Sequence, residues 1–192
     1  MRRTQRVFLI HGWDGHPGNH WFPLLTRELI QYGFGVFAPA MPHAAEPKVS
    51  EWVAHLNKTV IYPDEQTYFV GHSLGCIATV NFLEQLPERV RVGGAVFVGG
   101  FFEDLGEPDL AEFYSSPSVI EKAKTHCGSF VSILSDNDEQ VPLEKSLNFH
   151  KQLGGVLVIE KEKGHFCADD GVTELSSVLN AILDMAKISR ES

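Results

Sequence analysis

Cysteine is scarce in this sequence. The chain of 192 residues contains only Cys76, Cys127 and Cys167, with no Cys-x-x-Cys pair among them. Disulfide frameworks use cysteines in even numbers, so an odd and widely spaced set does not suit one. We therefore expect free thiols and a reducing compartment, and the cytoplasm is the expected location.

Long apolar runs and positive charge are also lacking. The N-terminal segment is basic and then apolar, but its apolar run covers only residues 7–10, and a secretory signal needs at least about seven residues. No run reaches the roughly 20 apolar residues that cross a bilayer as a helix. Lys and Arg number 16 against 25 Asp and Glu, which gives a net charge of −9. Nucleic acids and anionic membranes attract basic surfaces, so we expect neither as a partner.

What the chain does contain is a regular alternation of short apolar segments with longer segments of helical periodicity. The apolar segments are 6–10, 34–40, 67–71, 93–100, 129–135 and 155–161. The helical segments are 20–33, 49–61, 73–86, 118–128, 143–154 and 173–188. This alternation predicts one α/β domain over 1–192: a three-layer α/β/α sandwich with a six-stranded, mostly parallel sheet. Segment 101–117 looks structureless, and a loop of that length usually borders a functional site.

A possible nucleophile lies between the third strand and the third helix. The pentapeptide Gly71-His72-Ser73-Leu74-Gly75 fits Gly-x-Ser-x-Gly, the nucleophile elbow. Its glycines let strand and helix approach closely, and the strained serine projects its hydroxyl above the end of the sheet. The helix N-terminus then directs unpaired N–H groups at a reacting carbonyl. A tight glycine turn with an incidental serine is the alternative, which the strand-to-helix context disfavours.

A serine of this kind needs an oriented base. In folds with this elbow the partners follow in the order Ser, acid, His, each after a later strand. Asp138 follows the fifth predicted strand and His165 follows the sixth. We therefore predict a catalytic triad of Ser73, Asp138 and His165.

Three further carboxylates compete for the acid role. Asp136 lies two residues before Asp138, and Glu103 and Asp104 follow the fourth strand. We favour Asp138 because it directly precedes Glu-Gln-Val-Pro, whose proline begins the next segment. Aspartates also commonly form turns, which is the simplest interpretation of each one taken alone.

The oxyanion formed during acyl transfer needs two N–H donors. One normally belongs to the residue after the nucleophile and the other to the loop after the first strand. In this sequence His11-Gly12 ends the first strand and Trp13 follows. We assign the oxyanion hole to the backbone N–H groups of Trp13 and Leu74.

The remaining histidines and aromatic residues carry weaker signals. His11, His16 and His20 lie close together, but Pro17 and Gly18 separate the last two and no Cys or carboxylate cluster completes a ligand set. We expect structural roles for them and neither a metal nor another cofactor. The residues that could line a pocket or fill the core are His72, Trp21, Phe101, Phe102 and Phe166.

Four segments together indicate a family: HGWDGHPGNHWFP, VGHSLG, SDNDEQVP and GHF. In these motifs, in their order and in length, nearly the whole chain resembles the small serine hydrolases of the retinoblastoma-binding protein nine and YdeN type, within the α/β-hydrolase superfamily. The resemblance implies a compact sandwich, the triad Ser73, Asp138 and His165, and hydrolysis of esters or amides. The animal member is named for binding a pocket protein, but no feature of this acidic chain indicates that it has the same partner.

Two classes of function follow from these residues. The first is a serine hydrolase that cleaves small esters or amides, most simply a carboxylesterase, with amidase, peptidase or acyltransferase activity as variants of the same triad. The second is a protein-binding module on a hydrolase scaffold, because a fold does not guarantee a function. Segment 101–117 is too short for a large helical cap, so we expect an open, shallow site that suits small acyl groups.

Overall fold

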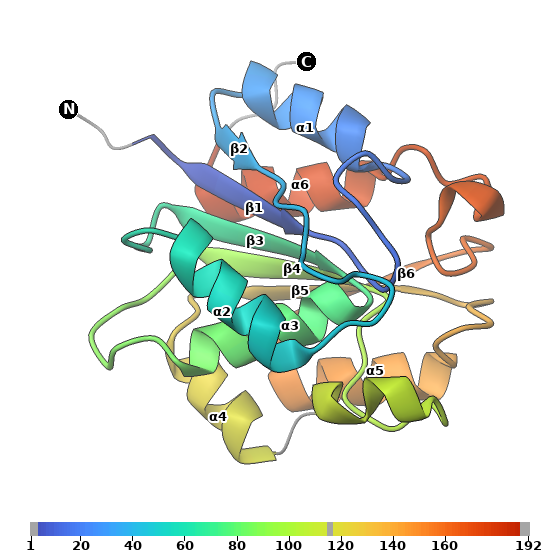
Figure 1. The fold of residues 1–192 in the computed structure, drawn as a ribbon. Helices are drawn as coiled ribbons and strands as arrows, with labels where there is room; N and C mark the ends of the chain where they lie inside the picture. The colour runs from blue at the N-terminus through green and yellow to red at the C-terminus, as the bar shows by residue number, and fades with distance from the viewer. Residues whose placement is uncertain (1–3, 115–116, 189–192) are drawn as a thin grey trace.

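The computed structural model describes residues 4–114 and 117–188, and its centre is a six-stranded sheet (Figure 1). All strands pair in parallel, in the order β2-β1-β3-β4-β5-β6. Their bounds are β1 Arg6–Ile10, β2 Gly35–Phe37, β3 Thr67–His72, β4 Gly94–Val98, β5 Phe130–Ser135 and β6 Val156–Glu160. The predicted α/β fold with a six-stranded sheet is confirmed.

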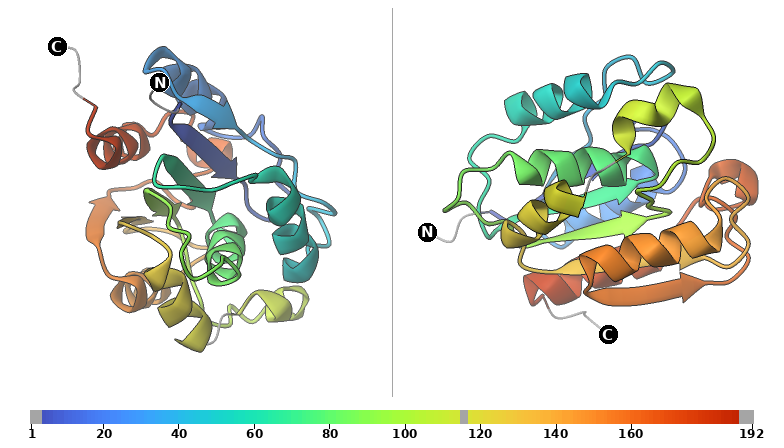
Figure 2. Two further views of the ribbon diagram at one scale, coloured as in Figure 1. Left: turned by 90° about the vertical axis from the view of Figure 1, so that its left-hand side faces the viewer. Right: turned by 90° about the horizontal axis from the view of Figure 1, so that it is seen from below.

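Helices cover both faces of the sheet, as the views in Figure 2 also show. One face packs against α1 (Phe22–Gln31) and α6 (Ser176–Ala186). The other packs against α2 (Val49–Thr59), α3 (Leu74–Glu84), α4 (Pro117–Thr125) and α5 (Leu143–Leu153). Side chains alternate between the faces along a strand, so Val7 and Leu9 of β1 join the first core while Phe8 and Ile10 join the second.

The connections place a crevice at the carboxyl ends of β1 and β3. After β1 the chain enters α1 on one face, and after β3 it enters α3 on the other face. Ligands of open parallel sheets bind where neighbouring strands send their connections to opposite faces. The loop after β1 and the turn at Ser73 both lie at this point.

Two features differ from the sequence-based expectation. Segment 101–117, predicted to be structureless, contains the 3₁₀ helix η1 (Pro108–Phe113). Leu110 and Phe113 are three residues apart, share one side of such a helix and are both buried. Strand β6 is apolar, as strands covered on both faces usually are, but it lies at the sheet edge, where Val156 is 55% exposed and Ile159 48%.

In residues 4–114 and 117–188, no helix combines the length and the apolar character that crossing a membrane requires.

Candidate active site

Ser73 occupies a strained turn between β3 and α3. Its backbone angles are φ 54° and ψ −121°, a region that residues with a Cβ seldom adopt. The turn is held on both sides: Ser73 N–H donates to the Val98 carbonyl at 2.9 Å, and the Ser73 carbonyl accepts from Cys76 N–H at 2.9 Å. The surroundings therefore maintain the strain that the elbow motif predicts.

The glycines of the motif are required by close approach. A Cβ on Gly71 would lie 2.7 Å from the Cys76 nitrogen, and a Cβ on Gly75 would lie 2.1 Å from the Ile10 carbonyl oxygen. Both distances are far below van der Waals contact with backbone that cannot move aside. Gly75 thus lets α3 begin directly against the end of β1.

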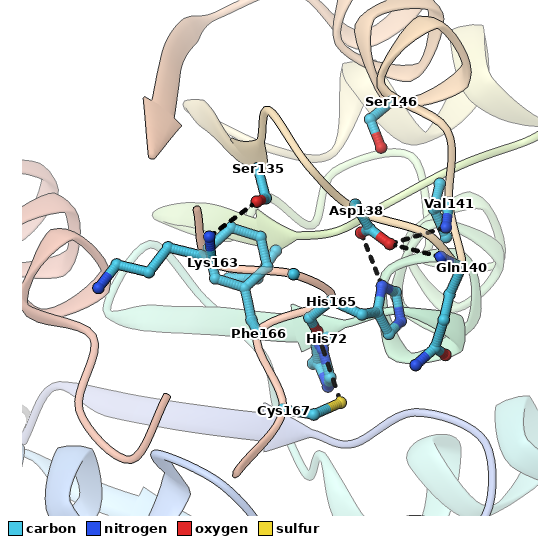
Figure 3. Close-up of polar contacts among 12 residues, drawn as sticks. His72, Ser135, Asp138, Gln140, Val141, Ser146, Lys163, His165, Phe166 and Cys167 are labelled. Carbon is cyan, nitrogen blue, oxygen red and sulfur yellow. Dashed lines mark hydrogen bonds and ion pairs between the residues drawn. The ribbon is translucent and has the colours of Figure 1, made fainter. Parts of the chain in front are cut away.

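His165 and Asp138 form a buried pair (Figure 3). His165 Nδ1 lies 2.8 Å from Asp138 Oδ2, and the two side chains are 4% and 2% exposed. The other carboxylate oxygen accepts the N–H groups of Gln140 at 2.9 Å and Val141 at 2.8 Å. A carboxylate accepts hydrogen bonds, so Nδ1 carries the proton and Nε2 is the free basic nitrogen.

The side chains before Asp138 fasten the loop that carries His165. Ser135 Oγ accepts Lys163 N–H at 3.1 Å, and Asn137 Oδ1 accepts Gly164 N–H at 2.8 Å. The rival acid Asp136 has a similar role, because its Oδ1 accepts the backbone N–H of Glu162 at 2.8 Å. Three consecutive side chains thus tie the end of β5 to the segment after β6, which brings Asp138 and His165 together.

The other two rival acids have different partners. Asp104 Oδ1 accepts Gly106 N–H at 2.6 Å, and Glu103 accepts a hydrogen bond from the Asn148 amide. Neither side chain bonds to His165. Among the four carboxylates considered from the sequence, Asp138 is the one hydrogen-bonded to the histidine.

Ser73 and His165 border the same cavity, whose volume is about 340 Å³. Ser73 is 9% exposed, and its hydroxyl makes no hydrogen bond to His165 or to any other described residue. Hydrogen bonds between nucleophile and base are often long in a free enzyme and tighten when substrate binds. The arrangement therefore leaves the hydroxyl without a hydrogen-bond partner among the described residues, in a cavity that His165 also lines.

The predicted oxyanion donors also border this cavity. Leu74 begins α3, where the first N–H groups have no partner within the helix. The N–H of Trp13 makes no hydrogen bond within the part of the chain that the structure describes. Both N–H groups thus belong to residues that border the cavity next to Ser73. Gly12 lets the loop after β1 pass this close to the serine, since a Cβ on Gly12 would lie 2.8 Å from the Ser73 Cβ.

His11 fixes the peptide that carries the Trp13 N–H. Its Nε2 accepts Met41 N–H at 2.9 Å, so Nδ1 holds the proton and donates to the Gly12 carbonyl at 2.9 Å. In a trans peptide the N–H points away from the C=O, so holding the Gly12 carbonyl directs the Trp13 N–H to the opposite side. Burial lowers the pKa of His11, which keeps Nε2 unprotonated and able to accept.

His72 and Asp170 hold the backbone of His165. The buried His72 ring places Nε2 2.8 Å from the His165 carbonyl, to which it donates. Asp170 Oδ2 accepts the N–H groups of His165 and Cys167, each at 2.9 Å. Burial lowers the pKa of His72 well below its ordinary value, and the neighbouring His165 adds to the shift. A neutral His72 therefore anchors the histidine loop without adding charge.

The pocket residues expected from sequence divide into two groups. His72 and Phe101 line the cavity. Trp21, Phe102 and Phe166 do not, and for these three the pocket prediction is wrong. Trp21 and Phe166 are fully buried in the core beneath α1 and α6, and Phe102 packs against Phe149 with ring centroids 4.4 Å apart. Apolar bulk drives all three into the core, which was the other interpretation of each.

Several cavity residues carried no recognisable signal in the sequence. The side chains from segment 101–117 are Leu105, Glu107 and Leu110, and those after Asp138 are Glu139, Gln140 and Val141. Each set follows a strand end named in the sequence analysis, so position could have suggested them even though residue type could not. Cys167 also borders the cavity, and partial burial raises the pKa of its thiol to about 11.

The clustered histidines serve structural roles in the loop after β1. His16 Nδ1 accepts Gly18 N–H at 3.0 Å, and His20 Nδ1 accepts Ala168 N–H at 2.9 Å. Outside residues 1–3, 115–116 and 189–192, no group of three or more His, Cys, Asp or Glu side chains is arranged to hold a metal ion.

Comparison with known proteins agrees with this geometry. The model of a family described as serine hydrolase matches residues 7–184. YdeN of Bacillus subtilis (strain 168) is 33% identical over 184 residues, which covers 93% of this chain and 95% of YdeN. The serine hydrolase RBBP9 of Rattus norvegicus is 26% identical over 167 residues, covering 85% and 87%.

Solved structures extend the comparison. The crystal structure of the ydeN gene product from B. subtilis superposes with a TM-score of 0.92 at 32% identity, covering 96% of this chain and all of the other. Est1E from Butyrivibrio proteoclasticus, in a structure with bound ferulic acid, gives a TM-score of 0.76 at 18% identity, covering 96% and 90%. At that identity the second match concerns the fold alone.

Proposed function

Because this chain belongs to the serine hydrolase family of the YdeN and RBBP9 type, with the α/β-hydrolase fold, we propose that it cleaves small esters through an acyl-enzyme on Ser73. The observation that carries the proposal is the buried hydrogen bond between Asp138 and His165 on the wall of the cavity that Ser73 also borders. Amides are the second substrate class, because the same three groups serve both reactions.

The proposed reaction begins with transfer of the Ser73 proton to His165 Nε2 as Oγ attacks the substrate carbonyl carbon. Negative charge develops on the carbonyl oxygen, where the N–H groups of Trp13 and Leu74 and the positive end of α3 stabilise it. The carbonyl reforms as the bond to the alcohol breaks, and the alcohol leaves with the proton from His165. Ser73 then carries the acyl group.

Water completes the cycle by the same steps in reverse order. His165 takes a proton from water, and the resulting hydroxyl attacks the acyl carbon on Ser73. Collapse of the second tetrahedral intermediate releases the acid and returns the proton to Ser73 Oγ. Asp138 holds Nδ1–H throughout and stabilises the imidazolium that forms in each half-reaction.

A fluorophosphonate probe tests this proposal directly. The folded protein should react with one equivalent of probe, and peptide mass mapping should locate the adduct on Ser73, because only a hydroxyl activated by a base attacks the phosphorus at a useful rate. Prior exposure to a small reactive ester should slow labelling. A folded protein that takes up no probe would instead support a binding role for the scaffold.

The size of the cavity predicts a preference for substrates with short acyl chains. A volume of about 340 Å³ suits a small acyl group, and Leu110 of η1 lies 3% exposed on the wall. The p-nitrophenyl esters of acetate and butyrate should react with kcat/KM at least about tenfold higher than the dodecanoate. Leu110→Ala should shift the preference toward longer chains.

The control for that variant lies on the other side of the sheet. Leu179→Ala removes a partly buried side chain of the α1 and α6 core and should leave the preference unchanged. A wild-type protein that prefers the dodecanoate would contradict the small-acyl assignment while leaving the hydrolase assignment intact.

A further inference from the structure

The charges around the cavity are all of one sign. Its described lining contains two glutamates that face no counter-ion, Glu107 at the start of η1 and Glu139 beside the acid Asp138. It contains no Lys or Arg. Neither glutamate forms an ion pair with a residue that the structure describes. A substrate in the cavity therefore meets uncompensated negative charge.

The histidines of the lining do not reverse this balance. Burial lowers the pKa of His11, and burial together with the nearby His165 lowers the pKa of His20 and of His72. All three are therefore neutral at neutral pH. The fourth, His165, works as the base only while it is neutral. No positive side chain is left in the described lining to attract an anion.

An aromatic ring adds a second contact for a cation. Trp13 borders the cavity, remains 39% exposed and is held in place by a hydrogen bond from its Nε1 to the Ala45 carbonyl at 2.9 Å. The face of a tryptophan attracts an ammonium group through its quadrupole. A fixed indole at an acidic mouth is thus suited to an alkylammonium group.

We propose that this site selects esters that carry a positively charged ammonium group over their uncharged isosteres, and that it discriminates against anionic esters. The proposal rests on the hydrolase function proposed above. The hydroxyl of Ser73, nine-tenths buried and unbonded at the cavity wall, is where the ester carbonyl reacts, and the ammonium group lies toward Glu107, Glu139 and Trp13.

Matched substrates of equal shape test the proposal. Acetylcholine and 3,3-dimethylbutyl acetate differ by a charge on the alcohol side, and 2-sulfoethyl acetate places an anion there. Trimethylglycine ethyl ester and ethyl 3,3-dimethylbutanoate place the same difference on the acyl side. Each kcat/KM is divided by the rate of hydrolysis by hydroxide, so that intrinsic reactivity cancels.

The wild-type protein should favour the cationic member of at least one pair by roughly three- to tenfold at low ionic strength, because Glu107 and Glu139 are both exposed and an exposed carboxylate attracts a cation only modestly. The preference should shrink as salt screens the charges. The double variant Glu107→Gln/Glu139→Gln should bring the ratio close to one. Glu112→Gln, which removes an exposed charge of η1 outside the cavity lining, should leave the ratio unchanged.

The possible outcomes distinguish a failure of the charge selectivity from a failure of the proposed hydrolase function. Hydrolysis of the neutral esters with no preference for either cation, or with a preference that survives the double variant, overturns the inference and leaves the hydrolase standing. Failure to hydrolyse any of the esters, together with no labelling of Ser73, removes the proposed function and the inference with it.

Discussion

Replacement of Ser73 by alanine should lower kcat for a small ester by about 10⁴- to 10⁶-fold, the loss seen when the nucleophile of a serine hydrolase is removed. Without Oγ no acyl-enzyme forms, so only substrate binding and the oxyanion donors remain. The protein should still fold. Ser73 Oγ makes no hydrogen bond that would be lost, and alanine has the same Cβ as serine at φ 54°.

The measurements are steady-state kinetics with a p-nitrophenyl ester and a thermal melt of each variant. Ser146→Ala is the matched control, because Ser146 is a buried serine whose Oγ donates to the Gly100 carbonyl at 3.1 Å, away from the elbow. It should cost about 1 kcal/mol of stability and change kcat little. Retention of more than a few per cent of kcat in Ser73→Ala would show that another group is the nucleophile.

The fold was predictable from the sequence because each element carries its own signal. Apolar runs such as 67–71 and amphipathic runs such as 143–154 alternate along the whole chain, and strict strand–helix alternation allows few topologies. The elbow was predictable for a related reason. Gly71 is required by contact with the helix that immediately follows it, which is a local constraint, whereas Gly75 is required by the carbonyl of Ile10 in β1 and was recognisable only through the motif.

The supports of the proposed triad could not be predicted in the same way. The contacts of His11 with Met41 and of His72 with His165 join residues 30 and 93 positions apart. No periodicity records such pairs, because each requires the finished sheet to bring two loops together. For the same reason Glu107 and Glu139 look like ordinary loop carboxylates until η1 and the loop after β5 are placed around the cavity.

Tertiary burial determines whether each aromatic side chain lies in the core or lines the cavity, and the sequence alone does not reveal that burial. Trp21 directly precedes α1 and its Nε1 donates to the Phe166 carbonyl at 3.1 Å. That bond satisfies the indole inside the core and removes any need for it to face the cavity. Trp13, eight residues earlier, is the tryptophan that borders the cavity. Both tryptophans follow β1 and precede or begin the turn into α1, and only their tertiary contacts tell them apart.

The assignment of Asp138, and not Asp136, as the acid that orients His165 can be tested by replacing each aspartate with asparagine. Asp138→Asn should lower kcat by about 10⁴-fold while leaving KM within a few-fold, because an amide does not hold the imidazole in the required tautomer or stabilise its charged form. The amide oxygen can still accept Gln140 N–H and Val141 N–H, which now bond to Oδ1, so the loop should remain in place.

Asp136→Asn is the matched control, since it makes the same chemical change two residues away. Its Oδ1 accepts the backbone N–H of Glu162, and an asparagine oxygen performs that task equally well. We expect nearly wild-type kcat and a thermal midpoint within a few degrees. If Asp136→Asn loses as much activity as Asp138→Asn, the effect arises from the loop as a whole and Asp138 has no distinct role. If Asp136→Asn alone is inactive, the acid is Asp136, and the loop after β5 must rearrange around substrate before the reaction begins.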